Sequence, residues 1–277
     1  MPMKSSPAAN RSTPLRRLRR AVSRSPVGRG WRRSSDLQLG QRALGFAALG
    51  FLTLVPLLLI VSSADPAHGQ GFAQWLGDGL GLSTASRRKV EELFTLPGQA
   101  LRTTTAFGIA TLAVFGLTFG SAVQTGYESV WALPAARWHA RWRHVVWLGV
   151  LTAYLFVSAT TGLWEGSVFG TWAALASAVL FLWWSQRMLL GGRVGWRALL
   201  PGAMATALGL FGLRIFSQVV FSPLIASNAV TYGPFGTVLV LQAWLVGVGV
   251  VVFGGALAGR VLHEELPRVA HALKRRR

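Results

Sequence analysis

Residues 236–258 read GTVLVLQAWLVGVGVVVFGGALA and contain no Asp, Glu, Lys or Arg. A helix needs about 20 predominantly apolar residues to cross the hydrocarbon core of a bilayer, and this stretch is long enough. Five further apolar stretches precede it, at residues 43–63, 105–125, 144–163, 171–190 and 199–220. With 52% apolar and only 13% charged residues, the chain has too little polar surface for a soluble domain of its size. The sequence therefore predicts an all-α polytopic membrane protein with six transmembrane helices.

The distribution of basic residues predicts how these helices are threaded. Cytoplasmic loops of membrane proteins carry an excess of Lys and Arg. Most of the 28 Lys and Arg residues lie in residues 1–42, in the second and fourth loops, or from Arg260 onward. The opposite side holds a few, all in the first outer loop, where acidic residues balance them: Arg87, Arg88, Lys89 and Arg102. Both termini are therefore predicted to be cytoplasmic.

Three regions follow from this pattern. Residues 1–42 are predicted to be a disordered basic cytoplasmic tail, because a segment rich in Ser, Pro and Arg buries too little apolar surface to offset the entropy of ordering. Residues 43–260 form the six-helix membrane domain, and residues 261–277 a basic cytoplasmic tail. In the first outer loop, apolar residues recur at helical spacing between residues 72 and 94. This spacing predicts short amphipathic helices that lie on the outer interface.

Charge and composition narrow the partners and the chemistry. The net charge of +19 could serve nucleic-acid binding, but the basic residues sit in cytoplasmic tails and loops, where anionic lipid headgroups attract them. We therefore expect the lipid bilayer, and no nucleic acid, as the partner. Cysteine is absent, which excludes disulfides and thiol catalysis. No motif indicates an enzyme, and we expect no catalytic residue, cofactor or metal site.

A stripe of threonines in the second span is the first candidate site. Thr104, Thr111, Thr118 and Thr125 recur at seven-residue intervals, and Glu128 follows at the inner end. Small and hydroxylated residues allow helices to approach closely and to hydrogen-bond, so we expect this stripe to face the bundle. It serves either helix packing or the lining of a polar pathway.

Arg214, in the fifth span, is the second candidate site. It shares the more polar face of its helix with Gln218, so we expect it to point into protein, where an ionisable residue in a span is by default a functional hypothesis. Glu165, in the third loop, is its expected counter-ion. The alternative is that Arg214 snorkels to the outer interface, because it lies only about 9 Å from that end of the helix.

Three small-xxx-small motifs are weak indications of a homo-oligomer. They are Gly116-x-x-x-Gly120, Gly166-x-x-x-Gly170 and Gly255-x-x-x-Gly259. Chance matches are common in a chain with 32 glycines.

The order of short motifs resembles the YihY/BrkB family of bacterial inner-membrane proteins, once labelled ribonuclease BN. The resemblance covers about residues 40–265 and rests on five segments: Leu54-Val55-Pro56-Leu57-Leu58, Val130-Trp131, Pro201-Gly202-Ala203, Tyr232-Gly233, and Trp244 followed by Gly254-Gly255-Ala256. It implies six helices with cytoplasmic termini and a role in envelope integrity or in export of a lipid or envelope precursor. The chain departs from the family pattern at Glu128, where Asn is common, and at Leu257, where a carboxylate is expected.

Three functions remain open from the sequence. The first is a transporter-like protein of the bacterial plasma membrane that moves or organises an amphipathic lipid or envelope component, with Arg214 and the threonine stripe on its polar path. The second is a non-transporting structural or partner-binding membrane protein. The third, and most remote, is the membrane-bound ribonuclease of the family's old label.

Overall fold

Six α-helices account for almost all of the chain that the computed structural model describes, namely residues 38–64, 105–135, 141–160, 168–232 and 234–274. Each helix contains or overlaps one of the six apolar stretches, and the described residues contain no strand. The all-helical class is therefore confirmed. In chain order the helices are α3 (Leu39–Ala64), α7 (Thr105–Val130), α8 (Arg141–Thr160), α9 (Val168–Leu189), α10 (Trp196–Tyr232) and α11 (Pro234–Lys274).

Two of these helices are long and apolar enough to cross a membrane by length and composition alone. The apolar segments are Trp196–Val220 in α10 and Val238–Glu265 in α11, and α3 carries a shorter apolar segment, Leu39–Leu54. The number of spans and the side on which the termini lie stay predictions. The amphipathic helices expected between residues 72 and 94 lie outside the described residues, as do residues 1–37 of the predicted tail at residues 1–42. The helix α3 begins at Leu39, so the last four residues of that predicted tail are helical.

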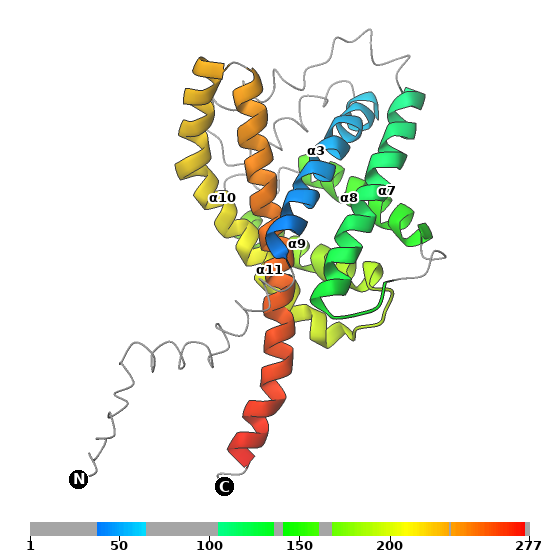
Figure 1. Cartoon of the computed structure of the whole chain (residues 1–277), viewed down its shortest axis with the longest axis vertical. Coiled ribbons are helices and arrows are strands. Elements are labelled where there is room, and N and C mark those ends of the chain that lie inside the picture. Colours follow the sequence, from blue (N-terminus) through cyan, green and yellow to red (C-terminus); the bar gives the residue numbers. More distant parts are fainter. Residues whose placement is uncertain (1–37, 65–104, 136–140, 161–167, 233, 275–277) are drawn as a thin grey trace, which may run out of the picture.

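The helices α10 and α11 form a long antiparallel hairpin (Figure 1). Pro234 is the first residue of α11, a position at which the fixed φ of proline suits a helix and its missing N–H costs nothing. Both helices continue well past the predicted apolar stretches, to Tyr232 and Lys274. Most of the predicted C-terminal tail is therefore helical, and this end of α11 projects away from the bundle (Figure 1).

Glycines allow α10 and α11 to pack backbone to backbone. A Cβ atom on Gly255 would lie 2.8 Å from the Cα of Thr206, and one on Gly259 would lie 2.5 Å from the Cα of Gly202. The Gly116 motif packs α7 against side chains of α8, where an added Cβ would meet a side-chain methyl of Leu148 at 2.5 Å. Two of the three small-xxx-small motifs therefore pack helices within one chain, and they give no support to a homo-oligomer.

The remaining helices complete the bundle around this hairpin. The helix α3 packs against both α7 and α11, α9 packs against α10, and α8 contacts α7 and α9. Aromatic rings fill the junction of α3, α7 and α11: the ring centroids of Phe46 and Phe119 lie 5.0 Å apart, and those of Tyr127 and Phe253 lie 6.1 Å apart. Tilted and edge-on pairs of this kind add packing energy beyond the area they bury.

Candidate functional site

A cavity of about 290 Å³ lies among the helices of the bundle. Five helices supply most of its wall, and Phe46 of α3 adds to it. Nearly all of the side chains that line it are aliphatic or aromatic, as is usual for small-molecule sites in proteins. Besides Phe46, the lining residues are Phe119, Val123, Tyr127, Trp147, Leu151, Tyr154, Leu155, Leu175, Ala178, Phe181, Leu182, Ser185, Ala207, Leu210, Phe211, Leu213, Arg214, Trp244, Val248 and Val252.

Aromatic side chains shape the wall that α8 and α9 provide. Tyr154 and Phe181 stack with their ring centroids 4.5 Å apart. The indole N–H of Trp147 donates a hydrogen bond of 2.6 Å to the hydroxyl of Ser185, and both groups are buried. This bond satisfies a polar atom that would otherwise cost free energy in an apolar site. This wall is therefore mainly apolar, and the indole N–H of Trp147 has a defined partner on it.

Arg214 is the one charged residue among the described residues that line the cavity. The surrounding part of α10 has a distinct inner and outer face. Ala207 and Ser217 are buried, whereas Ile215 and Val219 are 51% and 72% exposed. Apolar side chains thus point outward and small side chains inward, as expected of a helix whose outer face meets lipid. Arg214 faces the cavity from the inner side.

The described threonines of the stripe are not among the residues that line this cavity, and Thr104 lies outside the described residues. Thr111 is half-buried, and Thr118 and Thr125 are exposed. Their hydroxyls donate to carbonyls of their own helix, Thr118 to Val114 at 2.7 Å and Thr125 to Ser121 at 2.9 Å. The expectation that the stripe faces the bundle is wrong at these two positions, because a hydroxyl bonded within its own helix needs no partner on a neighbour.

Gln218 and Glu165 are two further members of the predicted site. Gln218 is exposed, and Glu165 lies outside the described residues. Among the members of the predicted pathway that the structure describes, Arg214 alone lines the cavity. A role for the rest in a polar pathway stays a prediction.

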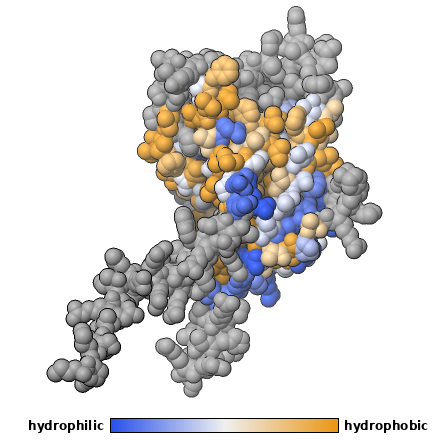
Figure 2. Space-filling model, viewed as in Figure 1, coloured by the Kyte–Doolittle hydropathy of each residue, from blue (hydrophilic) through white to orange (hydrophobic). Residues whose placement is uncertain are grey.

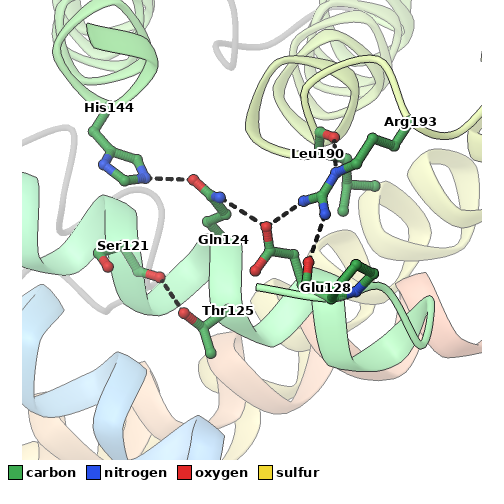
Figure 3. A network of polar contacts seen from close by, with 8 residues as sticks. Ser121, Gln124, Thr125, Glu128, His144, Leu190 and Arg193 are labelled. Carbon is green, nitrogen blue, oxygen red and sulfur yellow. Dashed lines mark hydrogen bonds and ion pairs between the residues drawn. The ribbon is translucent and has the colours of Figure 1, made fainter. Parts of the chain in front are cut away.

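Glu128 belongs to a buried polar network at the C-terminal end of α7 (Figure 3). The residue is only 4% exposed. Its carboxylate accepts a hydrogen bond of 2.8 Å from the amide of Gln124 and forms an ion pair with Arg193. The carbonyl of Gln124 in turn lies 2.5 Å from Nε2 of His144 on α8. We call these four residues the polar clasp.

The backbone around Arg193 explains how it reaches Glu128. Gly191 and Gly192 have φ values of 64° and 74° and form a sharp turn between α9 and α10, a conformation that glycine adopts without steric cost. Arg193 also donates to the carbonyls of Pro134 at 2.6 Å and Leu190 at 2.9 Å. The guanidinium thus ties the α9–α10 turn to the end of α7, and the clasp joins three parts of the chain next to Tyr127 of the cavity wall.

Sequence reasoning found Glu128 but missed the clasp. Arg193 counted only as one of several loop cations, and nothing in the local sequence links it to a residue 65 positions away. We infer that the clasp stabilises the structure and does not bind a ligand, because its carboxylate is already paired with a guanidinium and an amide. Within the described residues, no group of His, Asp or Glu is arranged to hold a metal ion.

The comparisons with known proteins agree with this architecture. The family model described as virulence factor BrkB matches residues 31–277. No curated protein and no solved structure matches the chain. The family match extends over all six helices and is consistent with apolar helices that expose apolar faces. The chain therefore belongs to the virulence factor BrkB family of helical membrane proteins.

Proposed function

We propose that this protein resides in the bacterial plasma membrane and moves or organises an amphipathic component of the cell envelope. The observation that carries the proposal is the apolar cavity with Arg214 on its wall. An amphipathic molecule has an apolar part, which such a lining would bury, and a polar or anionic part, which an arginine would bind.

The placement of Arg214 supports this proposal energetically. A charged side chain within an apolar helix is costly, and such residues usually mark a substrate or ion path. A guanidinium offers a planar fork of donors suited to carboxylate or phosphate. A cation on the wall of an otherwise apolar cavity is therefore well suited to the charged group of an amphiphile.

The proposed topology has six spans with both termini in the cytoplasm. It is supported by the concentration of Lys and Arg in residues 1–42, in the second and fourth loops and after Arg260, together with the positive-inside rule. In this orientation the polar clasp lies toward the cytoplasm. Arg214 lies at the middle of α10, in the outer half of its apolar segment Trp196–Val220.

Complementation of a deletion strain by Arg214 variants tests the function. At matched protein level in the membrane, Arg214→Leu should abolish the restored envelope integrity, whereas Arg214→Lys should retain part of it, because lysine keeps the charge but not the fork. The control is Arg197→Leu, the same substitution at an exposed position near the start of α10.

Envelope integrity is measured as resistance to detergent, together with the lipid and metabolite profile of each strain. Full activity of Arg214→Leu would contradict the proposal and reduce Arg214 to a side chain that snorkels to the interface.

A further inference from the structure

The size of the cavity limits what it can hold. Its volume of about 290 Å³ is at the lower end of the roughly 300–1,000 Å³ of ligand pockets in proteins. On α11 it extends from Trp244 to Val252, which is about 12 Å of helix at 1.5 Å per residue. A space of this length and volume suits one slender apolar chain and not several.

The register of the α10–α11 hairpin shows where polar groups gather along this space. Close approaches pair Thr206 with Gly255 and Leu213 with Gly247. Because the helices are antiparallel, the same register places Trp244 opposite residue 216. Trp244 therefore lies within one helical turn of the level of Arg214, and both line the cavity.

The end of the cavity marked by Arg214 and Trp244 carries hydrogen-bond donors. The indole Nε1 of Trp244 is buried and has no hydrogen-bond partner among the described residues. Both indole and guanidinium groups donate hydrogen bonds and accept none. A buried donor without an acceptor is destabilising, and a ligand that brings an acceptor to this place would remove that cost.

The opposite end of the cavity is apolar. Val252 of α11 and Tyr127 of α7 line it, and the ring of Tyr127 packs on Phe253. The cavity thus has a donor end and an apolar end, separated by about two turns of helix.

We propose that the ligand of this cavity is a single-chain anionic amphiphile, with its carboxylate or phosphate at Arg214 and Trp244 and its chain directed toward Tyr127 and Val252. This inference rests on the proposed function and specifies its substrate class. It differs from a general lipid-binding role in three respects: the number of chains, the charge of the head and the orientation.

A chain-length series tests the capacity of the cavity. Octanoate, decanoate, dodecanoate and hexadecanoate are titrated against the purified full-length protein in a neutral sugar detergent, by competition with a photoreactive fatty acid. Each methylene that enters the cavity should strengthen binding about fourfold, and the gain should stop before hexadecanoate, once the cavity is full. A constant gain through the whole series, or no gain at all, would overturn the proposal.

Head-group probes and variants test the donor end. Arg214→Gln should weaken binding of dodecanoate about tenfold and Trp244→Phe about fivefold, whereas neither should change binding of the uncharged alcohol dodecanol by more than about twofold. Arg197→Gln is the matched control. A single-chain lysophosphatidic acid in the same assay distinguishes a phosphate head from a carboxylate. Equal loss for acid and alcohol would refute a head-group site at Arg214.

Crosslinking tests the orientation of the bound amphiphile in the cavity. It uses the unmodified protein, so the result does not depend on the folding of a variant. A diazirine at the chain terminus should label peptides containing Tyr127 or Val252, and one next to the carboxylate should label peptides around Arg214 or Trp244. The reverse pattern, or labelling of outward-facing peptides only, would overturn the proposed orientation. Binding can fail while the deletion phenotype persists, so failure of this inference is distinguishable from failure of the proposed function.

Discussion

At the scale of single residues, the polar clasp shows how a buried charge is tolerated in an apolar bundle. Glu128 is buried, but its carboxylate has an amide donor from Gln124 and a guanidinium from Arg193. The ion pair offsets the free-energy cost of removing both charged groups from water. Removing one partner leaves the other as a buried charge without its counter-ion. The clasp therefore fixes the α9–α10 turn against α7 at a defined place.

This arrangement predicts unequal and coupled effects of substitution. Glu128→Ala should destabilise the protein by about 3 kcal/mol, because it removes the acceptor of the Gln124 amide and of Nη2 of Arg193. Arg193→Ala should cost more, because it leaves the buried carboxylate without a cation, whereas the guanidinium in Glu128→Ala keeps the carbonyls of Pro134 and Leu190. The double variant should show a coupling energy of about 1–3 kcal/mol in denaturation of the purified protein in detergent. Strictly additive losses would show that the ion pair contributes nothing.

The residue-scale site could be predicted from the sequence in part. Arg214 lines the cavity, as expected from its position on the more polar face of α10, but Gln218, which was expected on the same inward face, is exposed. The partner of Glu128 and the cavity itself could not be deduced, because they depend on how helices distant in sequence pack together. The orientation of the threonines was misjudged, because their hydroxyls bond within α7.

At the scale of helices, adjacent glycines in α11 have opposite surroundings. An added Cβ on Gly255 would approach the backbone of Thr206, whereas one on Gly254 would meet nothing within 4 Å. The same helix therefore contains a glycine that close packing requires and a neighbour that packing does not require.

Alanine substitution at these two positions should act in opposite directions. Gly255→Ala should destabilise the α10–α11 hairpin by about 1–3 kcal/mol, because the helices must separate or shift. Gly254→Ala should be neutral or stabilise by up to about 1 kcal/mol, the difference in helix propensity between the two residues. Thermal denaturation in detergent measures both effects. Equal effects of the two substitutions would contradict the close approach at Gly255.

The positions of the helices were predictable from the apolar stretches, but their ends were not. An apolar run shows where lipid can cover a helix, and not where its hydrogen bonding stops. The helix α11 continues after residue 258 through a charged segment, where Arg260 pairs with Glu264 at 2.8 Å and donates to the carbonyl of Val130 at 2.5 Å. Pairs at this spacing stabilise a helix, so the basic C-terminal segment extends α11.

At the scale of the whole molecule, the surface is divided by polarity. Hydrophobic residues cover much of the upper part of the face seen in Figure 2, and hydrophilic residues gather lower down. Large apolar side chains such as Leu180, Val219 and Leu239 are more than half exposed, while the clasp buries charge. A bilayer around the apolar region would cover these side chains.

Reporter fusions test the threading of the chain. A fusion after residue 195 or 277 should be active in the cytoplasm, and one after residue 228 should be active in the periplasm, because α10 crosses between residues 195 and 228 in the proposed topology. A periplasm-active reporter at residue 277 would contradict the positive-inside assignment.

The most direct test of the account is to fill the cavity and to measure function. Ala178 lines the cavity, whereas Ala176 of the same helix is exposed. Ala178→Phe places a ring in the space assigned to the ligand, and Ala176→Phe places the same ring outside. At equal membrane abundance and thermal stability, Ala176→Phe should complement a deletion strain and Ala178→Phe should not. Full complementation by Ala178→Phe would show that the protein works without its cavity and would contradict the account.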